Sequence, residues 1–151
     1  MTEERTIDDI MEIAIQREQE AADFYNDLSH RAAFAAMKET FHEFAKEELR
    51  HKAKLMNVKK GGGLTSSNET IPDLKIGDYL RSQEVGPDLD YQGALIVAMK
   101  REKAAFRLYS GLAEIATDPL IKELFLGLAQ EEAKHKLKFE IEYDEVILKD
   151  N

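Results

Sequence analysis

Two short motifs of the form Glu-x-x-His are the part of this sequence with the residue types and spacing of a metal site. Each follows another glutamate by 30 residues. Side chains three positions apart share one face of a helix, so each motif offers a carboxylate oxygen and an imidazole nitrogen together, a combination that suits iron or manganese. The candidate metal-binding and catalytic residues are Glu18, Glu48, His51, Glu102, Glu132 and His135.

The four glutamates of this set occupy positions where the surrounding pattern predicts apolar residues. Glu18, for example, lies seven residues after Met11 and seven before Tyr25, and the other three have similar neighbours. Burying an ionised carboxylate is costly, and four together would repel one another. Two divalent cations would balance the four charges. The alternative is that some of these side chains reach solvent at the edge of the core.

Glu47 and Glu131 are alternative ligands, because each lies four residues before a histidine. The residues that precede Glu47 on its own helix face, Thr40 and Glu43, are polar. A polar face points away from a core. We therefore favour the glutamate that follows each of these two as the ligand.

Other polar residues of the same segments have simpler interpretations. Tyr25 and Tyr109 either hydrogen-bond to ligand carboxylates or serve only as core residues. His30 and His42 are predicted to be solvated surface residues. Four lysines are predicted to form solvent-facing charge pairs, namely Lys52, Lys54, Lys136 and Lys138.

Four segments with apolar residues at every third or fourth position must place these side chains, and we predict that they are helices. The first two form a hairpin over residues 7–60, which stops at three consecutive glycines. The last two form a hairpin over residues 91–148, and Asp118-Pro119 marks the start of its second helix. Residues 61–90 read as a long crossover, with one short helical candidate at Ile76–Ser82.

The two predicted hairpins are related in sequence. A shift of 84 residues aligns 15–55 with 99–139 and gives 15 identities in 41 positions. The midpoint between the two glutamates of each hairpin falls at Ala33 or at Thr117, where we place the turns. Both glutamates of a hairpin are therefore expected at the same height along the bundle.

Composition limits the remaining possibilities. The 151 residues suit a single domain, 1–151, with one core. The net charge of -9, with no basic run free of acids, argues against nucleic acid and anionic membranes as partners. The absence of cysteine excludes disulfides, thiolate nucleophiles and iron–sulfur centres. Neither a signal peptide nor a long apolar window is evident, so we expect a cytoplasmic protein.

The whole constellation resembles the ferritin-like di-iron carboxylate proteins, in which two helices contribute one glutamate each and two contribute Glu-x-x-His. Within that class it is similar to the di-iron domain of the rubrerythrins, over roughly residues 7–147. The resemblance implies an all-α, ferritin-like four-helix bundle with two iron ions, or manganese or zinc in their place. By the same likeness Glu48 and Glu132 would bridge the metals, and Glu18 and Glu102 would be terminal ligands.

The resemblance also implies a function, a non-haem di-iron oxidoreductase that reduces hydrogen peroxide or dioxygen. Rubrerythrins typically add a seventh ligand, a glutamate, where this sequence has Ala105, and a rubredoxin module with cysteines. We therefore expect electrons from an external electron-transfer protein. The alternatives are an iron-handling protein that oxidises and sequesters Fe(II), which Ala105 favours, and a non-catalytic bundle stabilised by metal. A homodimer is expected, and the long crossover would allow two chains to exchange hairpins.

Overall fold

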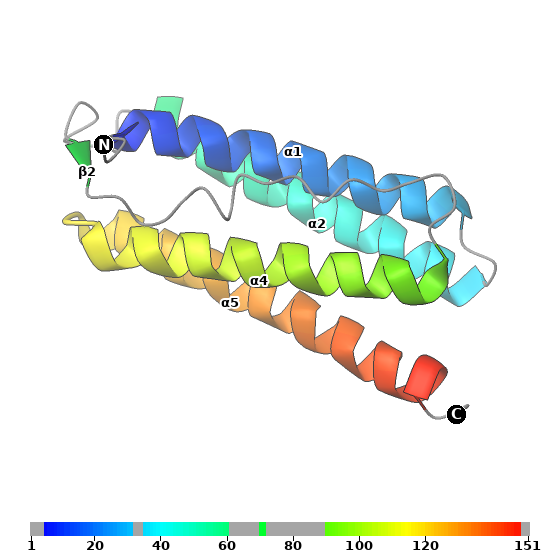
Figure 1. Ribbon diagram of the computed structural model, residues 1–151. Helices are drawn as coiled ribbons and strands as arrows, with labels where there is room; N and C mark the ends of the chain where they lie inside the picture. Colours follow the sequence, from blue (N-terminus) through cyan, green and yellow to red (C-terminus); the bar gives the residue numbers. More distant parts are fainter. Residues whose placement is uncertain (1–4, 32–34, 61–69, 72–89, 149–151) are drawn as a thin grey trace.

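The computed structural model describes residues 5–31, 35–60, 70–71 and 90–148. It is a bundle of four long helices, which confirms the predicted fold class (Figure 1). The helices are α1 (Ile7–Arg31), α2 (Ala35–Lys60), α4 (Tyr91–Ile115) and α5 (Pro119–Glu142), and α5 continues as a π-helical turn η1 (Tyr143–Leu148). None of the described helices is long and apolar enough to cross a bilayer.

The helices pack as two hairpins, α1 with α2 and α4 with α5, as the internal repeat predicts. Helix α2 ends and α4 begins at opposite ends of the bundle (Figure 1). The short helix predicted at residues 76–82 lies outside the described residues. A two-residue antiparallel pairing of β1 (Arg5–Thr6) with β2 (Thr70–Ile71) was not predicted.

Local capping explains where the second hairpin begins and turns. The Asp90 side chain accepts a hydrogen bond of 2.7 Å from the Gly93 amide at the start of α4. The Asp118 side chain accepts one of 2.8 Å from the Leu120 amide, and Pro119 occupies the first turn of α5. Both arrangements satisfy backbone N–H groups that have no partner within the helix. The predicted starts of these two helices are confirmed.

The interior consists of two apolar clusters with a polar layer between them. One cluster contains Met11, Leu55, Leu112 and Phe125. The other is rich in aromatic rings and contains Tyr25, Phe41, Phe44 and Phe139. Because the clusters close both ends of the polar layer, charged groups there are shielded from water along the bundle axis.

Candidate metal centre

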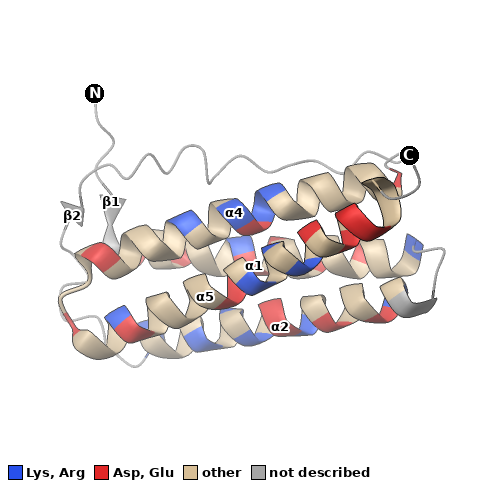
Figure 2. Ribbon diagram, turned by 90° about the horizontal axis from the view of Figure 1, so that it is seen from below, with Lys and Arg blue, Asp and Glu red and all other residues tan. Residues whose placement is uncertain are grey.

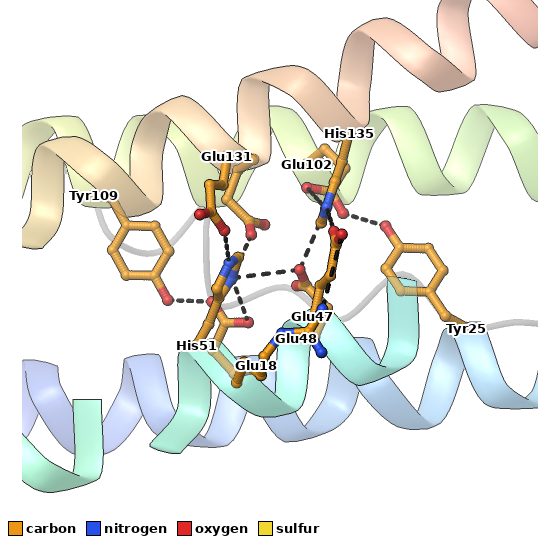
Figure 3. A network of polar contacts seen from close by, with 11 residues as sticks. Glu18, Tyr25, Glu47, Glu48, His51, Glu102, Tyr109, Glu131 and His135 are labelled. Atoms are coloured by element: carbon orange, nitrogen blue, oxygen red, sulfur yellow. Dashed lines mark hydrogen bonds and ion pairs between the residues drawn. The ribbon is translucent and has the colours of Figure 1, made fainter. Parts of the chain in front are cut away.

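The polar layer is built from all four helices. Helices α1 and α4 each contribute one glutamate, while α2 and α5 each contribute a glutamate and the histidine one turn later (Figure 3). None of these six residues is more than 4% exposed. They are Glu18, Glu48, His51, Glu102, Glu132 and His135. The structure thus brings together the six predicted residues, and the alternative in which some glutamates reach solvent is wrong.

The six residues form two overlapping groups, each of which could hold one ion. The first comprises Glu18, Glu48, His51 and Glu132, and the second comprises Glu48, Glu102, Glu132 and His135. Within each group the candidate ligand atoms lie within 4.8 Å of one another. Glu48 and Glu132 belong to both groups. This sharing is the geometry required of carboxylates that bridge two ions.

Each of the six residues has one buried polar atom without a hydrogen-bond partner in the described part of the chain. These atoms are Glu18 Oε2, Glu48 Oε1, His51 Nδ1, Glu102 Oε2, Glu132 Oε1 and His135 Nδ1. Buried polar atoms are nearly always satisfied, so six orphans in one place call for an additional partner. Four carboxylate oxygens and two imidazole nitrogens fit two divalent iron or manganese ions in number, charge and donor type.

Electrostatics of the protein groups support the same interpretation. Burial raises the pKa of Glu48 well above its usual value, and Glu18 and Glu102 raise it further. Burial also raises the pKa of Glu132, and repulsion from Glu102 and Glu48 raises it further. Burial and mutual repulsion therefore disfavour the ionised form of both carboxyl groups, and a bound cation would offset this cost.

The histidines point Nδ1 toward the carboxylates. His51 Nδ1 lies 2.9 Å from Glu132 Oε1 and 3.5 Å from Glu48 Oε1, and His135 Nδ1 lies 3.4 Å from Glu48 Oε1. Burial opposes the charging of His51, but the negative charges of Glu132 and Glu18 raise its pKa to about 11. Burial also opposes the charging of His135, but Glu102 and Glu47 together raise its pKa. A metal ion at Nδ1 would take the place of a proton.

The opposite nitrogen of each histidine contacts a glutamate from the other hairpin. His51 Nε2 donates to Glu131, and His135 Nε2 donates to Glu47 (Figure 3). Burial raises the pKa of Glu131, but the bond to His51 and the positive charges of His51, Lys54 and His135 together lower it by more, so the net shift of the pKa is downward. Such carboxylate–imidazole pairs fix the orientation of a metal-binding ring and increase its basicity.

Glu47 was predicted to lie on a polar face, and the structure adds that Glu47 and its repeat equivalent Glu131 nevertheless reach the histidines of the centre. Their side chains are 34% and 44% exposed, yet each is bonded to a histidine of the centre. Helical periodicity describes one helix at a time, so it could not predict these contacts with a neighbouring helix. The sequence did contain one indication of a shared role: positions 47 and 131 are both glutamate and are equivalent under the 84-residue shift.

Two buried tyrosines also connect the hairpins. Each packs in the core and also donates a hydrogen bond to a glutamate of the centre, so both of the predicted roles are confirmed. Tyr25 on α1 donates to Glu102 on α4, and Tyr109 on α4 donates to Glu18 on α1 (Figure 3). Burial first, and then the neighbouring carboxylate, raises the pKa of each hydroxyl. Both therefore remain protonated donors, and each orients one glutamate of the centre.

A small cavity opens beside the centre between α1 and α4, and we call it the α1/α4 cavity. It has a volume of about 30 Å³, and Ala21, Ala105, Arg17 and Arg101 contribute to its lining. One water needs about 10–15 Å³ of such space, so a molecule of two heavy atoms fits but nothing much larger. Burial lowers the pKa of both arginines. The position of these two arginines beside the centre was not predicted from the sequence.

The remaining assignments have mixed outcomes. His30 and His42 are exposed, as predicted. Lys136 forms the expected charge pair, at 2.6 Å from Glu140. Lys52 instead donates to the neutral Gln19, so the predicted charge pair is wrong there. Lys54 and Lys138 are exposed at the rim of a pocket that is described below.

The chain is similar to known proteins both in sequence and in fold. A family model described as Rubrerythrin matches residues 9–143. The crystal structure of a protein from Thermotoga maritima, described as a ferritin-like diiron-carboxylate protein, superimposes with a TM-score of 0.76 at 21% identity. The alignment covers 95% of this chain and 97% of that chain. No match is found among curated proteins.

Proposed function

The chain belongs to the rubrerythrin family, and on that premise we propose that it is a non-haem di-iron oxidoreductase. In this proposal it reduces hydrogen peroxide or dioxygen with electrons from an external donor. The observation that carries the proposal is the set of six orphaned ligand atoms arranged as two groups that share Glu48 and Glu132. Two metal ions bound there would supply the electrons and polarise the O–O bond.

The residues around the centre suit such a reaction. The α1/α4 cavity is large enough for peroxide or dioxygen and too small for an organic substrate. Its arginines, Arg17 and Arg101, bring positive charge to the side on which an oxygen species gains electrons. Tyr25 and Tyr109 hold the terminal glutamates in place, while Glu47 and Glu131 hold the histidines.

The overall reaction consumes two electrons and two protons for each peroxide and releases two waters. The sequence contains no cysteine, so the chain carries no thiolate-bound redox centre. In this proposal the electrons reach the metals from an external donor. The proton of Tyr109 and the protons on the arginines lie at the same cavity, where the oxygen species would be held.

A decisive test is turnover under anaerobic conditions. Protein loaded with Fe(II) is mixed with excess peroxide and a chemical reductant, and peroxide is measured over time. We expect many equivalents to be consumed per chain, together with a ferric absorption band that appears and then decays. Glu48→Gln should lose this activity, whereas Glu39→Gln, an exposed position on the same helix, should retain it.

Iron handling is the second candidate, and one observation favours it. Ala105 lines the α1/α4 cavity where the family typically has a seventh ligand, so the centre has six protein ligands. In that case peroxide consumption would stop once the loaded Fe(II) is oxidised, and each chain would retain many irons. A site that shows no ferric band at all would reject both redox functions in favour of a metal-stabilised bundle.

A further inference from the structure

The outer edges of the two histidines open into a second, larger cavity between α2 and α5. This α2/α5 pocket has a volume of about 280 Å³. Its floor consists of the His51–Glu131 and His135–Glu47 pairs described above. Four basic side chains complete the lining, namely Arg50, Lys54, Lys134 and Lys138. The pocket is thus the place where candidate metal ligands come closest to bulk solvent on this side of the bundle.

The basic rim follows the internal repeat. Arg50 and Lys134 occupy equivalent positions under the 84-residue shift, as do Lys54 and Lys138. All four residues are exposed. Four positive charges against two glutamates leave a local excess of two, in a chain whose net charge is -9. The surrounding helices mix acidic and basic positions along their length, as Figure 2 shows.

These charges are only partly engaged by neighbouring side chains. Arg50 lies 3.9 Å from Glu47, and Lys138 lies 5.5 Å from the centre of the Phe44 ring. Lys54 lies close enough to Glu131 to lower the pKa of that carboxyl group, and among the described residues Lys134 takes part in no ion pair. Cations that converge on one concave surface without matching acids attract an anionic partner.

The pocket also provides a short route to the metals. An electron donor placed against its floor would be separated from the candidate metal positions by one imidazole ring, because Nδ1 of each histidine faces the centre and Nε2 faces the pocket. The α1/α4 cavity on the other side is about 30 Å³ and admits only small molecules. Oxidant and donor would therefore approach from opposite sides.

We propose that the α2/α5 pocket is the docking surface for the electron donor, a redox protein with acidic side chains around its redox group. This inference rests on the proposed function. Two encounters, each of which would oxidise one donor molecule by one electron, would supply the two electrons that the proposed reaction consumes. The lining is entirely polar or charged, so association is driven by charge and is transient, as is typical of electron-transfer partners.

Binding can be tested without turnover. The protein is loaded with redox-inert zinc and titrated with hexacyanochromate(III), a paramagnetic trianion, while amide resonances are recorded by NMR. We expect line broadening centred on residues 50–54 and 134–138, which decreases as salt is added and which poly-L-glutamate, an acidic polypeptide, reverses. Broadening centred elsewhere, or no competition by polyglutamate, would overturn the proposal.

A matched pair of double variants isolates the pocket from the overall charge. Lys54→Glu with Lys134→Glu reverses two rim charges, and Lys38→Glu with Lys122→Glu makes the same change at exposed positions on the same helices outside the pocket. Metal content and circular dichroism establish that both are folded and loaded. Only the rim variant should lose the broadening. Equal loss in both variants would mean that net charge alone attracts the probe.

Reduction kinetics then connect binding with electron transfer. The oxidised iron protein is reduced in a stopped-flow instrument by dithionite, which is anionic, or by reduced methyl viologen, which is cationic. We expect dithionite to reduce the rim variant about tenfold more slowly than the control variant. Reduction by methyl viologen should proceed at the same rate in both variants or faster in the rim variant. Equal dithionite rates in the two variants would overturn docking at this pocket, even if the trianion binds there. Failure of the proposed function would show differently, as a centre that neither reductant reduces.

Discussion

At the scale of single residues, the structure gives adjacent glutamates different roles. Glu48 and Glu132 are buried within the centre, while Glu47 and Glu131, one position earlier, face the outer nitrogens of the histidines. One step along a helix turns a side chain by about 100°. That rotation is sufficient to separate a group that would contact the metals from one that positions a ligand.

Glu48→Gln should have opposite effects on metal binding and on the stability of the metal-free protein. The amide removes a bridging oxygen and a negative charge, so we expect fewer than two metals per chain by elemental analysis. Burial raises the pKa of Glu48, so at neutral pH its ionisation opposes folding when no cation is bound. The metal-free variant should therefore be more stable than the wild type by about 1–3 kcal/mol in urea denaturation. Lower stability of the metal-free variant would contradict this account.

Glu131→Gln should weaken metal binding without changing its stoichiometry. The amide accepts a weaker hydrogen bond from His51, so the ring is held less firmly and is less basic. We expect a loss of about 10–100-fold in affinity, measured by competition with a chelator. Glu123→Gln, an exposed position on the same helix, is the control and should bind like the wild type. The same comparison can be made on α2 with Glu47→Gln and Glu39→Gln.

At the scale of the elements, each helix must present its ligands at the right height and rotation. The three-residue spacing within α2 and α5 places glutamate and histidine on one face, and the caps determine where the second hairpin begins and turns. Two apolar clusters then hold the helices together above and below the polar layer. The helices that carry the ligands are thus held together largely by packing above and below the centre.

Asp118→Ala should destabilise the second hairpin. The variant leaves the Leu120 and Ile121 amides, both of which bond to Asp118, without their acceptor. We expect a loss of about 1 kcal/mol in the free energy of unfolding, measured by denaturation of the metal-free protein. Asp118→Asn keeps a side-chain acceptor and should lose much less. Equal losses in the two variants would show that charge at the helix terminus, rather than the hydrogen bonds, is responsible.

At the scale of the whole molecule, folding and metal binding are coupled through the same buried acids and histidines. Without a cation, the folded chain holds protons at Glu48, Glu132, His51 and His135 more tightly than the unfolded chain. With metals bound, those protons are displaced. The two forms should therefore respond to pH in opposite directions.

The metal-free protein should become less stable as pH rises from about 6 to 9. Raised carboxyl pKa values in the folded state lower stability once pH exceeds their usual value of 4.5. The contribution of His51 is fully present below 6.5 and is lost as pH rises toward about 11. Melting curves of chelator-treated protein test this directly. Zinc-loaded protein, by contrast, should gain stability over the same range, and parallel trends in the two forms would contradict the coupling.

The homodimer stays a prediction, and α5 offers a surface for it. Leu126, Leu137 and Ile141 are 49%, 56% and 47% exposed on this helix. Sedimentation should give twice the chain mass of 17.2 kDa, and Leu137→Glu should shift the equilibrium toward a single chain. A monomer at micromolar concentration would contradict the expectation. Mixing chains that carry different tags would then test whether hairpins exchange.

The helices, the hairpin repeat and the six residues of the centre could be predicted from the sequence. This was possible because periodicity and capping are local, and because an acid within an apolar stripe stands out along a single helix. The repeat then strengthened the assignment, since Glu48-x-x-His51 recurs as Glu132-x-x-His135 with an upstream glutamate in each case.

The contacts between side chains of different hairpins could not be predicted in this way and are seen only in the folded molecule. The pairs Tyr25–Glu102, Tyr109–Glu18, His51–Glu131 and His135–Glu47 join residues that are 77 to 91 positions apart. The α1/α4 cavity and the α2/α5 pocket likewise arise between helices. Such contacts depend on the relative height and rotation of packed helices. Those two variables are set by the fit of side chains from all four helices, so no single segment of sequence contains them.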